Sequence, residues 1–136
     1  MIKRLSHCTV FVTDQARAKE FYTEKLGMEV RADITMGPFR WLTVGSPTQP
    51  DLELVLMPVG SAPGQNDDDR AALKKLVEKG AVGVGVFATD DCHKSYAELS
   101  AKGVRFAGPP EERPYGVEAT LFDDSGNMFS LTQRRS

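Results

Sequence analysis

The chain has 136 residues, of which 40% are hydrophobic and 26% charged, and its formal net charge is −2. This composition is typical of one globular domain with a sizeable core, and it gives no basic surface for nucleic acid. No apolar run approaches the roughly 20 residues that a membrane-spanning helix needs, so we expect no membrane partner. The N-terminal stretch MIKRLSHCTVFVTD does not resemble a signal peptide. With only two cysteines, the chain is expected to be cytoplasmic with reduced thiols.

The first part of the chain has the pattern of a strand, a helix and three further strands. Residues 5–12, LSHCTVFV, are rich in the apolar and β-branched types that strands favour. Asp14 is placed to cap a helix over QARAKEFYTEKL, whose apolar residues recur at helical spacing, and Gly27 ends it. The runs MEVRAD, FRWLTVG and DLELVLM then predict three strands separated by turn residues. Residues 1–58 therefore predict a βαβββ module.

A connector follows at residues 59–80. Its first part is rich in Gly, Pro and Ser and predicts a loop. The stretch DDDRAALKKLVEKG predicts a short helix, because its acidic residues come first and its lysines later, as the helix dipole favours.

Residues 81–136 repeat the order of the first module. AVGVGVFATD predicts a strand, Asp91 caps the helix CHKSYAELSAKG, and the strands VRFAG, GVEATLFD and NMFSLTQ follow. An offset of 77 residues places Asp14 on Asp91, and the same offset places Glu53 on Ser130. Self-similarity of this kind predicts an α+β fold of two tandem βαβββ modules within one structural domain.

Strand alternation selects the residues that face a binding site. On the first strand His7, Thr9 and Phe11 share one side, and on the fourth strand Glu53 and Val55 point away from the leucines that face the core. Trp41 shares a side with Phe39 and Thr43, and forms either the floor of a site for a planar ligand or part of the core. The loop EERPYG, residues 111–116, places Tyr115 where it can form a rim. Arg40 and Glu118 are expected to form a structural ion pair.

These segments together are similar to a known family. HCTVFVTDQARAKEFYTEKLGMEV, DLELVL, DDCHKSYAELSAKGVRF and FDDSGNMFSLTQ resemble the vicinal oxygen chelate superfamily, which includes glyoxalase I, bleomycin-resistance proteins and extradiol dioxygenases. The resemblance implies curled mixed sheets with helices outside and small molecules bound inside. It specifies the fold more closely than the function, because this fold hosts binders, isomerases, lyases and oxygenases.

The resemblance also implies where a metal would bind. In metal-dependent members the ligands come from the first and fourth strands of a module, which here are the positions of His7, Glu53, Val84 and Ser130. Valine cannot bind a metal ion and a neutral serine hydroxyl is a poor ligand, whereas a catalytic divalent site usually needs three protein ligands. We therefore expect no metal or other cofactor. If a metal does bind, His7 and Glu53 are its ligands; otherwise the two form a structural pair or contact a ligand.

The leading hypothesis is a metal-independent protein that holds a small organic molecule in an apolar cup and forms a homodimer. Two alternatives stay open: a glyoxalase-type lyase or isomerase that uses a divalent metal with His7 and Glu53, and a catalytically silent regulatory or partner domain. The lining expected for the cup comes from both modules: His7, Thr9, Phe11, Trp41, Glu53, Val55, Val84, Tyr115 and Ser130.

Overall fold

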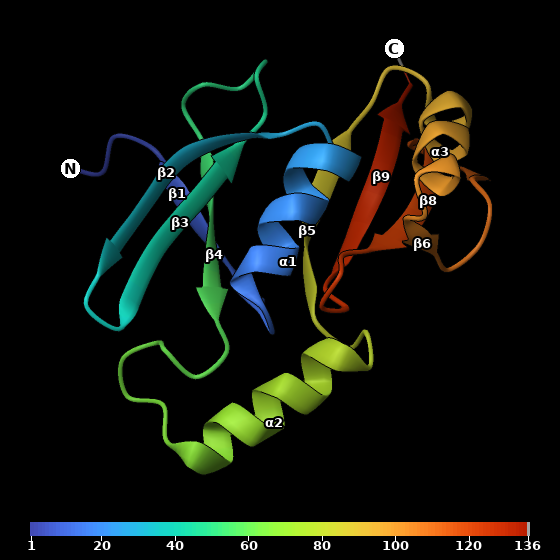
Figure 1. Cartoon of the computed structure of the whole chain (residues 1–136). Helices are drawn as coiled ribbons and strands as arrows, with labels where there is room; N and C mark the ends of the chain where they lie inside the picture. Colours follow the sequence, from blue (N-terminus) through green and yellow to red (C-terminus); the bar gives the residue numbers. More distant parts are fainter. Residues whose placement is uncertain (136) are drawn as a thin grey trace. The chain divides into compact units, whose positions relative to one another are not determined.

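The computed structural model describes residues 1–135 and divides into two compact units, Met1–Lys75 and Leu76–Ser136. Each unit contains a mixed sheet and a helix that follows the first strand of that sheet, so the predicted α+β fold of paired βαβββ modules is confirmed (Figure 1). The strand orders are β1-β4-β3-β2 in the first unit and β5-β9-β8-β6 in the second, where β7 also pairs with β8. In both sheets the first and last strands of the module lie side by side and parallel.

The elements follow the predicted order. The first unit contains β1 (His7–Val12), α1 (Gln15–Glu20), a π-helical turn η1 (Phe21–Lys25), β2 (Glu29–Met36), β3 (Phe39–Gly45) and β4 (Glu53–Pro58). Helix α2 (Asp67–Glu78) comes next in the chain. The second unit contains β5 (Gly83–Ala88), α3 (Cys92–Ala101), β6 (Arg105–Phe106), β7 (Glu111–Arg113), β8 (Gly116–Phe122) and β9 (Met128–Arg134). In the described residues no helix is long and apolar enough to cross a membrane.

The predicted helix caps are confirmed in both units. The carboxylate of Asp14 accepts a hydrogen bond from the backbone N–H of Arg17 at 3.0 Å, and that of Asp91 accepts one from Lys94 at the same distance. Each cap satisfies one of the N–H groups that have no partner inside the first turn. The helical segments end near Gly27 and Gly103, whose φ angles of 74° and 88° suit glycine.

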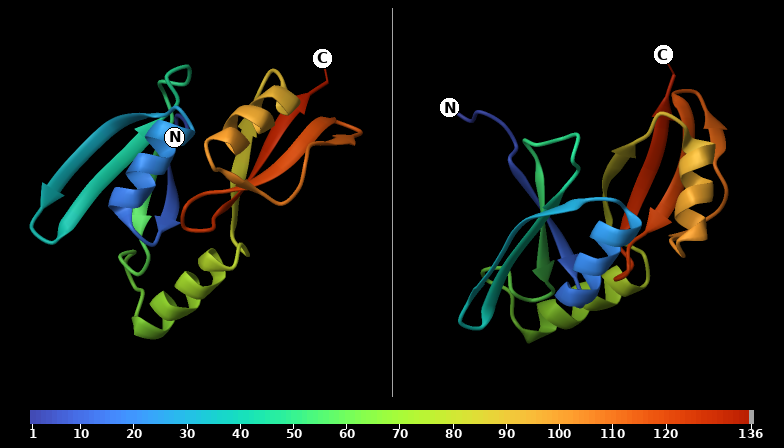
Figure 2. Two further views of the ribbon diagram at one scale, coloured as in Figure 1. Left: turned by 45° about the vertical axis from the view of Figure 1, so that its right-hand side comes forward. Right: turned by 45° about the horizontal axis from the view of Figure 1, so that its top comes forward.

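The helix of each unit packs on one face of its sheet, as Figure 2 shows for α1 and α3. In the first unit Leu42, Val44 and Leu56 are completely buried on this face, together with Ala18 and Tyr22 of the helical segment. In the second unit the corresponding face is filled by apolar side chains that are at most 5% exposed: Cys92, Val104, Ala119, Leu121, Phe129 and Leu131. Alternation along the strands therefore directs the neighbouring residues to the opposite side, which we call the helix-free face of each sheet.

The hairpin around residues 111–116 differs from the prediction. We expected EERPYG to be a loop, but Glu111–Arg113 forms β7, which pairs antiparallel with β8. Pro114 and Tyr115 form the tight turn between the two strands. Charged residues on a short edge strand carry no hydrophobic alternation, so the pattern that marks half-buried strands was missing here.

The stretch DDSGN between β8 and β9 forms a buried turn around one carboxylate. Oδ1 of Asp123 accepts hydrogen bonds from the backbone N–H groups of Ser125, Gly126 and Asn127 at 3.0, 2.9 and 2.8 Å. Oδ2 accepts a fourth bond, at 2.9 Å, from the side-chain amide of Asn127, which is completely buried. Asp123 thereby fixes the turn that leads into β9.

Candidate functional site

The helix-free face of the first unit carries most of the residues that the sequence nominates. The register places His7 beside Glu53 and Thr9 beside Val55, with Phe11 further along β1. Val55 is in turn paired with Thr43, and Trp41 precedes Thr43 by two residues on the same side of β3. The predicted grouping of His7, Thr9, Phe11, Trp41, Glu53 and Val55 on one face agrees with this register.

Glu53 is held by a hydroxyl and accompanied by an imidazole. The Thr43 hydroxyl, which is completely buried, donates to Oε1 of Glu53 at 2.6 Å. Nε2 of His7 lies 3.6 Å from Oε2, which is too far for a good hydrogen bond but within range of an ion pair when the ring is protonated. Nδ1 of His7 lies 2.9 Å from the Ser6 hydroxyl. The group combines a fixed carboxylate with an accessible imidazole, since the His7 side chain is 40% exposed.

Aromatic and apolar side chains surround this polar group. The ring of Trp41 lies 6.0 Å from that of His7 and 6.5 Å from that of Phe39, measured between centroids. Ile34 is in register with Trp41, and Met36 with Phe39. Ile34 and Met36 are more than half exposed although apolar, so this end of the sheet offers a surface for the flat, apolar part of an organic molecule.

The residues of the first unit do not fit a catalytic metal centre. His7 and Glu53 supply two ligands, and Oε1 of Glu53 is engaged by Thr43. Throughout residues 1–135 no three His, Cys, Asp or Glu side chains gather closely enough to hold a metal ion. A divalent centre of the catalytic kind usually takes three protein ligands and keeps one open position.

A cavity of about 350 Å³, wide open to solvent, lies on the helix-free face of the second unit. Ser130 and Val84, both nominated from the sequence, belong to its wall. The full lining is Gly83, Val84, Gly85, Val86, Thr120, Met128 and Ser130. Apolar walls with a few hydroxyls, at this volume, are the usual make-up of a site for a small organic ligand.

Ser130 takes part in an arrangement that mirrors Glu53. Its hydroxyl donates to Oε2 of Glu118 at 2.6 Å, the same distance as from Thr43 to Glu53. In the first unit the hydroxyl is on the third strand of the module and the carboxylate on the fourth. In the second unit the hydroxyl is on the fourth strand, β9, and the carboxylate on the third, β8. The acid that the repeat leads one to expect at Ser130 is therefore supplied by the neighbouring strand.

Glu118 is the centre of the second polar group. Besides Ser130, the Tyr115 hydroxyl donates to it at 2.7 Å, and the Arg113 guanidinium lies 3.8 Å away. The hydrogen bonds from Ser130 and Tyr115 lower the pKa of the Glu118 carboxyl, because they favour its charged form. The same bond raises the pKa of Tyr115, whose proton is held by the carboxylate. Tyr115 is half exposed, on the turn that leads into β8.

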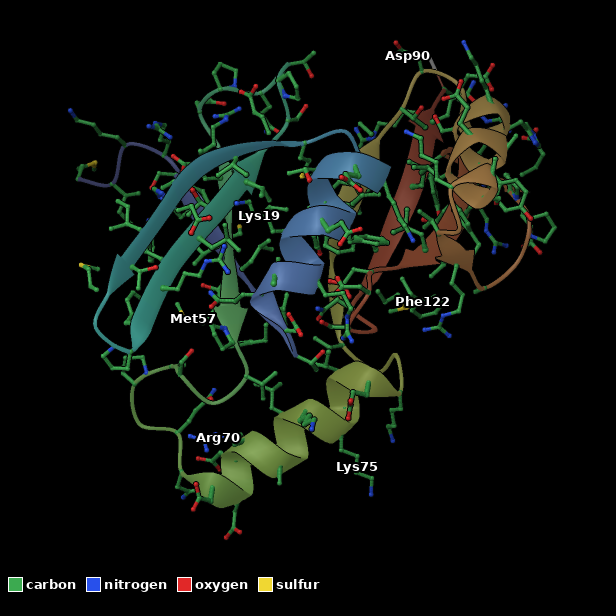
Figure 3. The ribbon with its side chains drawn as sticks, viewed as in Figure 1. Lys19, Met57, Arg70, Lys75, Asp90 and Phe122 are labelled. Atoms are coloured by element: carbon green, nitrogen blue, oxygen red, sulfur yellow. The ribbon has the colours of Figure 1, made fainter. Side chains whose placement is uncertain are left out.

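One expectation from the sequence needs correction. The predicted pair of Arg40 with Glu118 is replaced by another: the Arg40 guanidinium donates to both carboxylate oxygens of Asp33 at 2.8 Å, and Asp33 also binds Lys19 of α1, which is labelled in Figure 3. In the second sheet Val86 is in register with Ser130, and the pairing of β5 with β9 is shifted between Gly83 and Gly85. The partner of a long strand side chain such as Arg40 depends on the strand register, which the sequence does not specify.

Several residues of these faces were not nominated. Ile34 and Met36 fall on a strand that the structure extends three residues beyond the predicted MEVRAD run. Thr43 shares the side of Trp41, and a hydroxyl two residues from a nominated aromatic was a usable signal. Glu118 was assigned to an ion pair, and its hydrogen bond to Ser130 needs the register of β8 against β9.

Comparison with known proteins agrees with this architecture. The family model of the glyoxalase/bleomycin resistance protein/dioxygenase superfamily matches residues 4–131. The uncharacterized protein YurT of Bacillus subtilis (strain 168) is 35% identical over 127 residues, which are 93% of this chain and 95% of YurT.

Two crystal structures are similar over almost the whole chain. UcmS2 is 48% identical with a TM-score of 0.91, and the match covers 98% of this chain and 99% of UcmS2. TnmS3, an antibiotic binding protein from Streptomyces sp. CB03234, is 30% identical with a TM-score of 0.77, and 98% of each chain is covered. The chain therefore belongs to the glyoxalase/bleomycin resistance protein/dioxygenase superfamily.

Proposed function

We propose that this protein binds a small, largely apolar organic molecule without a metal ion, as a sequestering protein rather than an enzyme. The observation that carries the proposal is the cavity of about 350 Å³ on the helix-free face of the second unit. Val84, Val86 and Met128 give it apolar walls, while Thr120 and Ser130 offer hydroxyls that can orient a ligand.

The first unit supports the same proposal. Its helix-free face presents Trp41 and Phe39 beside a fixed carboxylate, which suits a planar ligand with a hydrogen-bonding edge. The similarity to TnmS3, an antibiotic binding protein, favours an antibiotic or another natural product of that size as the ligand. The ligand-contacting residues that we propose are those nominated from the sequence, namely His7, Thr9, Phe11, Trp41, Glu53, Val55, Val84, Tyr115 and Ser130, with Val86 and Thr120 added.

Metal independence is tested on protein purified without a chelator or a histidine tag. We expect no stoichiometric divalent metal by elemental analysis, because two protein ligands do not offset the cost of dehydrating the ion. One equivalent of zinc, nickel, iron or manganese per chain, lost in His7→Ala, would overturn this reading and favour the glyoxalase-type lyase or isomerase.

Ligand binding is tested with 2-naphthol as an aromatic probe and its saturated counterpart decahydro-2-naphthol as the control. Val86→Glu places a charge in the cavity wall and is expected to abolish the calorimetric signal of 2-naphthol at this site. Ala88→Glu is the matched control, because Ala88 lies two residues further on the same strand and is not part of the lining. Equal binding to both variants would refute the assignment of the cavity.

The first unit has its own readout. Trp41 is the only tryptophan, so quenching of its fluorescence reports contact with the helix-free face of that unit. We expect 2-naphthol to quench it more than decahydro-2-naphthol does, because only the aromatic compound stacks. Equal quenching by the two compounds would count against a planar ligand.

The proposal extends to a cytoplasmic homodimer. Cys8 and Cys92 are free thiols, as expected in a reducing compartment. Strands β2 and β5 each lie at the end of their sheet, and a second copy would pair with such an edge. Light scattering that gives only the monomer mass at micromolar concentration would contradict the dimer.

A further inference from the structure

A second cavity, of about 160 Å³, lies in the second unit between the 107–109 loop and the β7–β8 hairpin. Its wall is formed by Ala107, Gly108, Pro109, Glu111, Arg113, Glu118, Ala119 and Thr120. An engineered apolar cavity of about 150 Å³ accommodates benzene, so this space has the size of one six-membered ring. Thr120 also lines the larger cavity, but the remaining lining residues differ.

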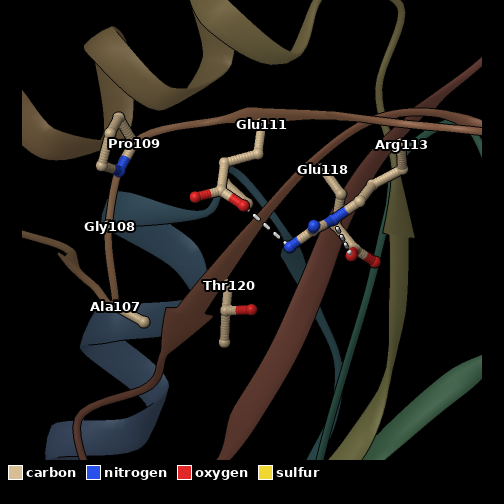
Figure 4. Close-up of a pocket in the computed structure, with 8 residues that line it drawn as sticks. Ala107, Gly108, Pro109, Glu111, Arg113, Glu118 and Thr120 are labelled. Carbon is tan, nitrogen blue, oxygen red and sulfur yellow. Dashed lines mark ion pairs between the residues drawn. The ribbon is translucent and has the colours of Figure 1, made fainter.

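The charged side chains on one wall are unbalanced. Glu111 and Glu118 are directly opposite each other across β7 and β8, an arrangement that is unfavourable for like charges. Arg113 lies between them: Nη2 is 2.8 Å from Oε2 of Glu111, and Nε is 3.8 Å from Oε1 of Glu118 (Figure 4). One guanidinium thus faces two carboxylates, and the lining carries a net charge of about −1.

The two carboxylates differ in what they can offer a ligand. Glu118 is engaged by two hydroxyls, since Ser130 and Tyr115 donate to it at 2.6 and 2.7 Å. Glu111 is 60% exposed, and the ion pair with Arg113 engages its Oε2. Glu111 is therefore the carboxylate that can bind a further donor, while Glu118 contributes its charge from a fixed position.

We propose that this cavity binds an organic ammonium group carried on a small ring, as in an amino sugar or a cyclic amine. A cation balances the negative net charge of the Glu111–Arg113–Glu118 group, and an N–H of the ammonium donates to Glu111. Thr120 also lines this space and suits a polar substituent of the ring. A bare metal ion would leave most of the space unfilled, and an anion would have to displace Glu111 from Arg113. The inference goes beyond the proposed function, because it concerns a different cavity and a ligand of opposite character.

Three probes share one six-membered ring and differ in charge: cyclohexylamine, cyclohexanol and cyclohexanecarboxylate. Each is titrated into the ¹⁵N-labelled chain, and the backbone amides of residues 107–108 and 118–120 are followed by nuclear magnetic resonance. We expect saturable shifts with cyclohexylamine only, and weaker binding as salt screens the charges. Comparable shifts with cyclohexanol or cyclohexanecarboxylate, or displacement of the amine by equimolar magnesium chloride, would overturn the proposal.

A pair of variants tests the carboxylate that binds the amine. Glu111→Gln is expected to weaken cyclohexylamine binding at least about tenfold, the usual cost of losing a hydrogen bond to a charged group. Glu112→Gln removes the same charge from the same strand, but Glu112 binds Arg135 at 3.0 Å and does not line the cavity, so binding should be unchanged. Equal weakening by the two variants would refute the site.

The two cavities are separable in the same experiments. Glu111→Gln should leave the binding of 2-naphthol at the larger cavity intact, because that lining does not include Glu111. If cyclohexylamine does not bind while 2-naphthol does, this inference alone is refuted. If 2-naphthol does not bind while cyclohexylamine does, the proposed function alone is refuted.

Discussion

Asp123 is the residue whose removal should destabilise the second unit most clearly. Asp123→Ala removes the acceptor of the backbone N–H groups of Ser125 and Asn127 and of the Asn127 side-chain amide, in a turn where Asp123, Ser125 and Asn127 are at most 5% exposed. The Gly126 N–H keeps a second acceptor, the Asp123 backbone carbonyl, at 3.2 Å. Each buried donor that loses its partner costs about 1–3 kcal/mol. Water that enters the turn can bind some of these donors and so recovers part of the cost. We therefore expect a loss of about 3–5 kcal/mol in the free energy of unfolding.

Asp123→Asn separates the acceptor from the charge. Oδ1 can still accept the three backbone hydrogen bonds, but the new amide would meet the side-chain amide of Asn127, which now donates to Oδ2. One hydrogen bond is lost and the others are no longer assisted by charge, so the expected loss is about 1–2 kcal/mol. The order of stability should be wild type, Asp123→Asn, Asp123→Ala.

Urea denaturation followed by circular dichroism measures this order. With a slope of about 2 kcal/mol per molar urea, Asp123→Ala should lower the midpoint of the transition by about 1.5–2.5 M. Asp90→Asn, on the exposed loop before α3 that is labelled in Figure 3, removes the same charge and should leave the midpoint unchanged. An Asp123→Ala midpoint that corresponds to a loss below about 1 kcal/mol would refute the reasoning.

Three further outcomes are expected. Thr43→Val keeps the shape of a buried side chain but loses its 2.6 Å bond to the partly exposed Glu53, and should lower the free energy of unfolding by about 1 kcal/mol and the urea midpoint by about 0.5 M; an unchanged midpoint would contradict this. Hydrogen bonds from its cationic partners lower the pKa of the Asp33 carboxyl, so its contribution is present above its unfolded pKa of about 3.9 and is lost as pH falls further. Asp33→Asn should therefore destabilise the protein at pH 7 and less at pH 3, and an equal effect at both would be the contrary result. Burial raises the pKa of the Cys92 thiol, so in a Cys8→Ser background Ellman's reagent should react only after unfolding.

The elements of this fold could be predicted because their signals are local. Asp14 and Asp91 cap their helices because a short acidic side chain reaches a free N–H three residues on, whatever the rest of the chain does. The alternation in FRWLTVG separates Trp41 and Thr43 from Leu42 and Val44, and in the structure Leu42 and Val44 lie completely buried on the face that α1 covers. The repeat of the βαβββ order then follows from the order of these local patterns.

The register between strands could not be predicted in the same way. In the first unit His7 lies beside Glu53, 46 positions later, whereas in the second Val86 lies beside Ser130, 44 positions later. The shift at Gly83–Gly85 and the pairing of β8 with β9 depend on packing across the whole sheet. An alignment with one offset therefore compares residues that share a face but do not have the same neighbours.

Ser130, near the end of the stretch DDSGNMFSL, shows what such an alignment misses. Thr43 is paired with Val55 and is thus diagonal to Glu53, and Glu118 is paired with Thr132 and is thus diagonal to Ser130. In each sheet a carboxylate is held by a hydroxyl on the neighbouring strand. The strand that carries the donor in one sheet corresponds to the strand that carries the acceptor in the other.

This exchange changes the chemistry available on each helix-free face. Glu53 is engaged by one hydroxyl and has an imidazole beside it, whereas Glu118 accepts from two hydroxyls and lies beside Arg113. A carboxylate with its lone pairs so occupied serves to hold the surrounding side chains rather than to bind a metal ion. The carboxylate of the second sheet is on β8, and the β5 residues that line the larger cavity are valines and glycines. Shape and apolar contact are therefore the means by which the larger cavity can select a ligand.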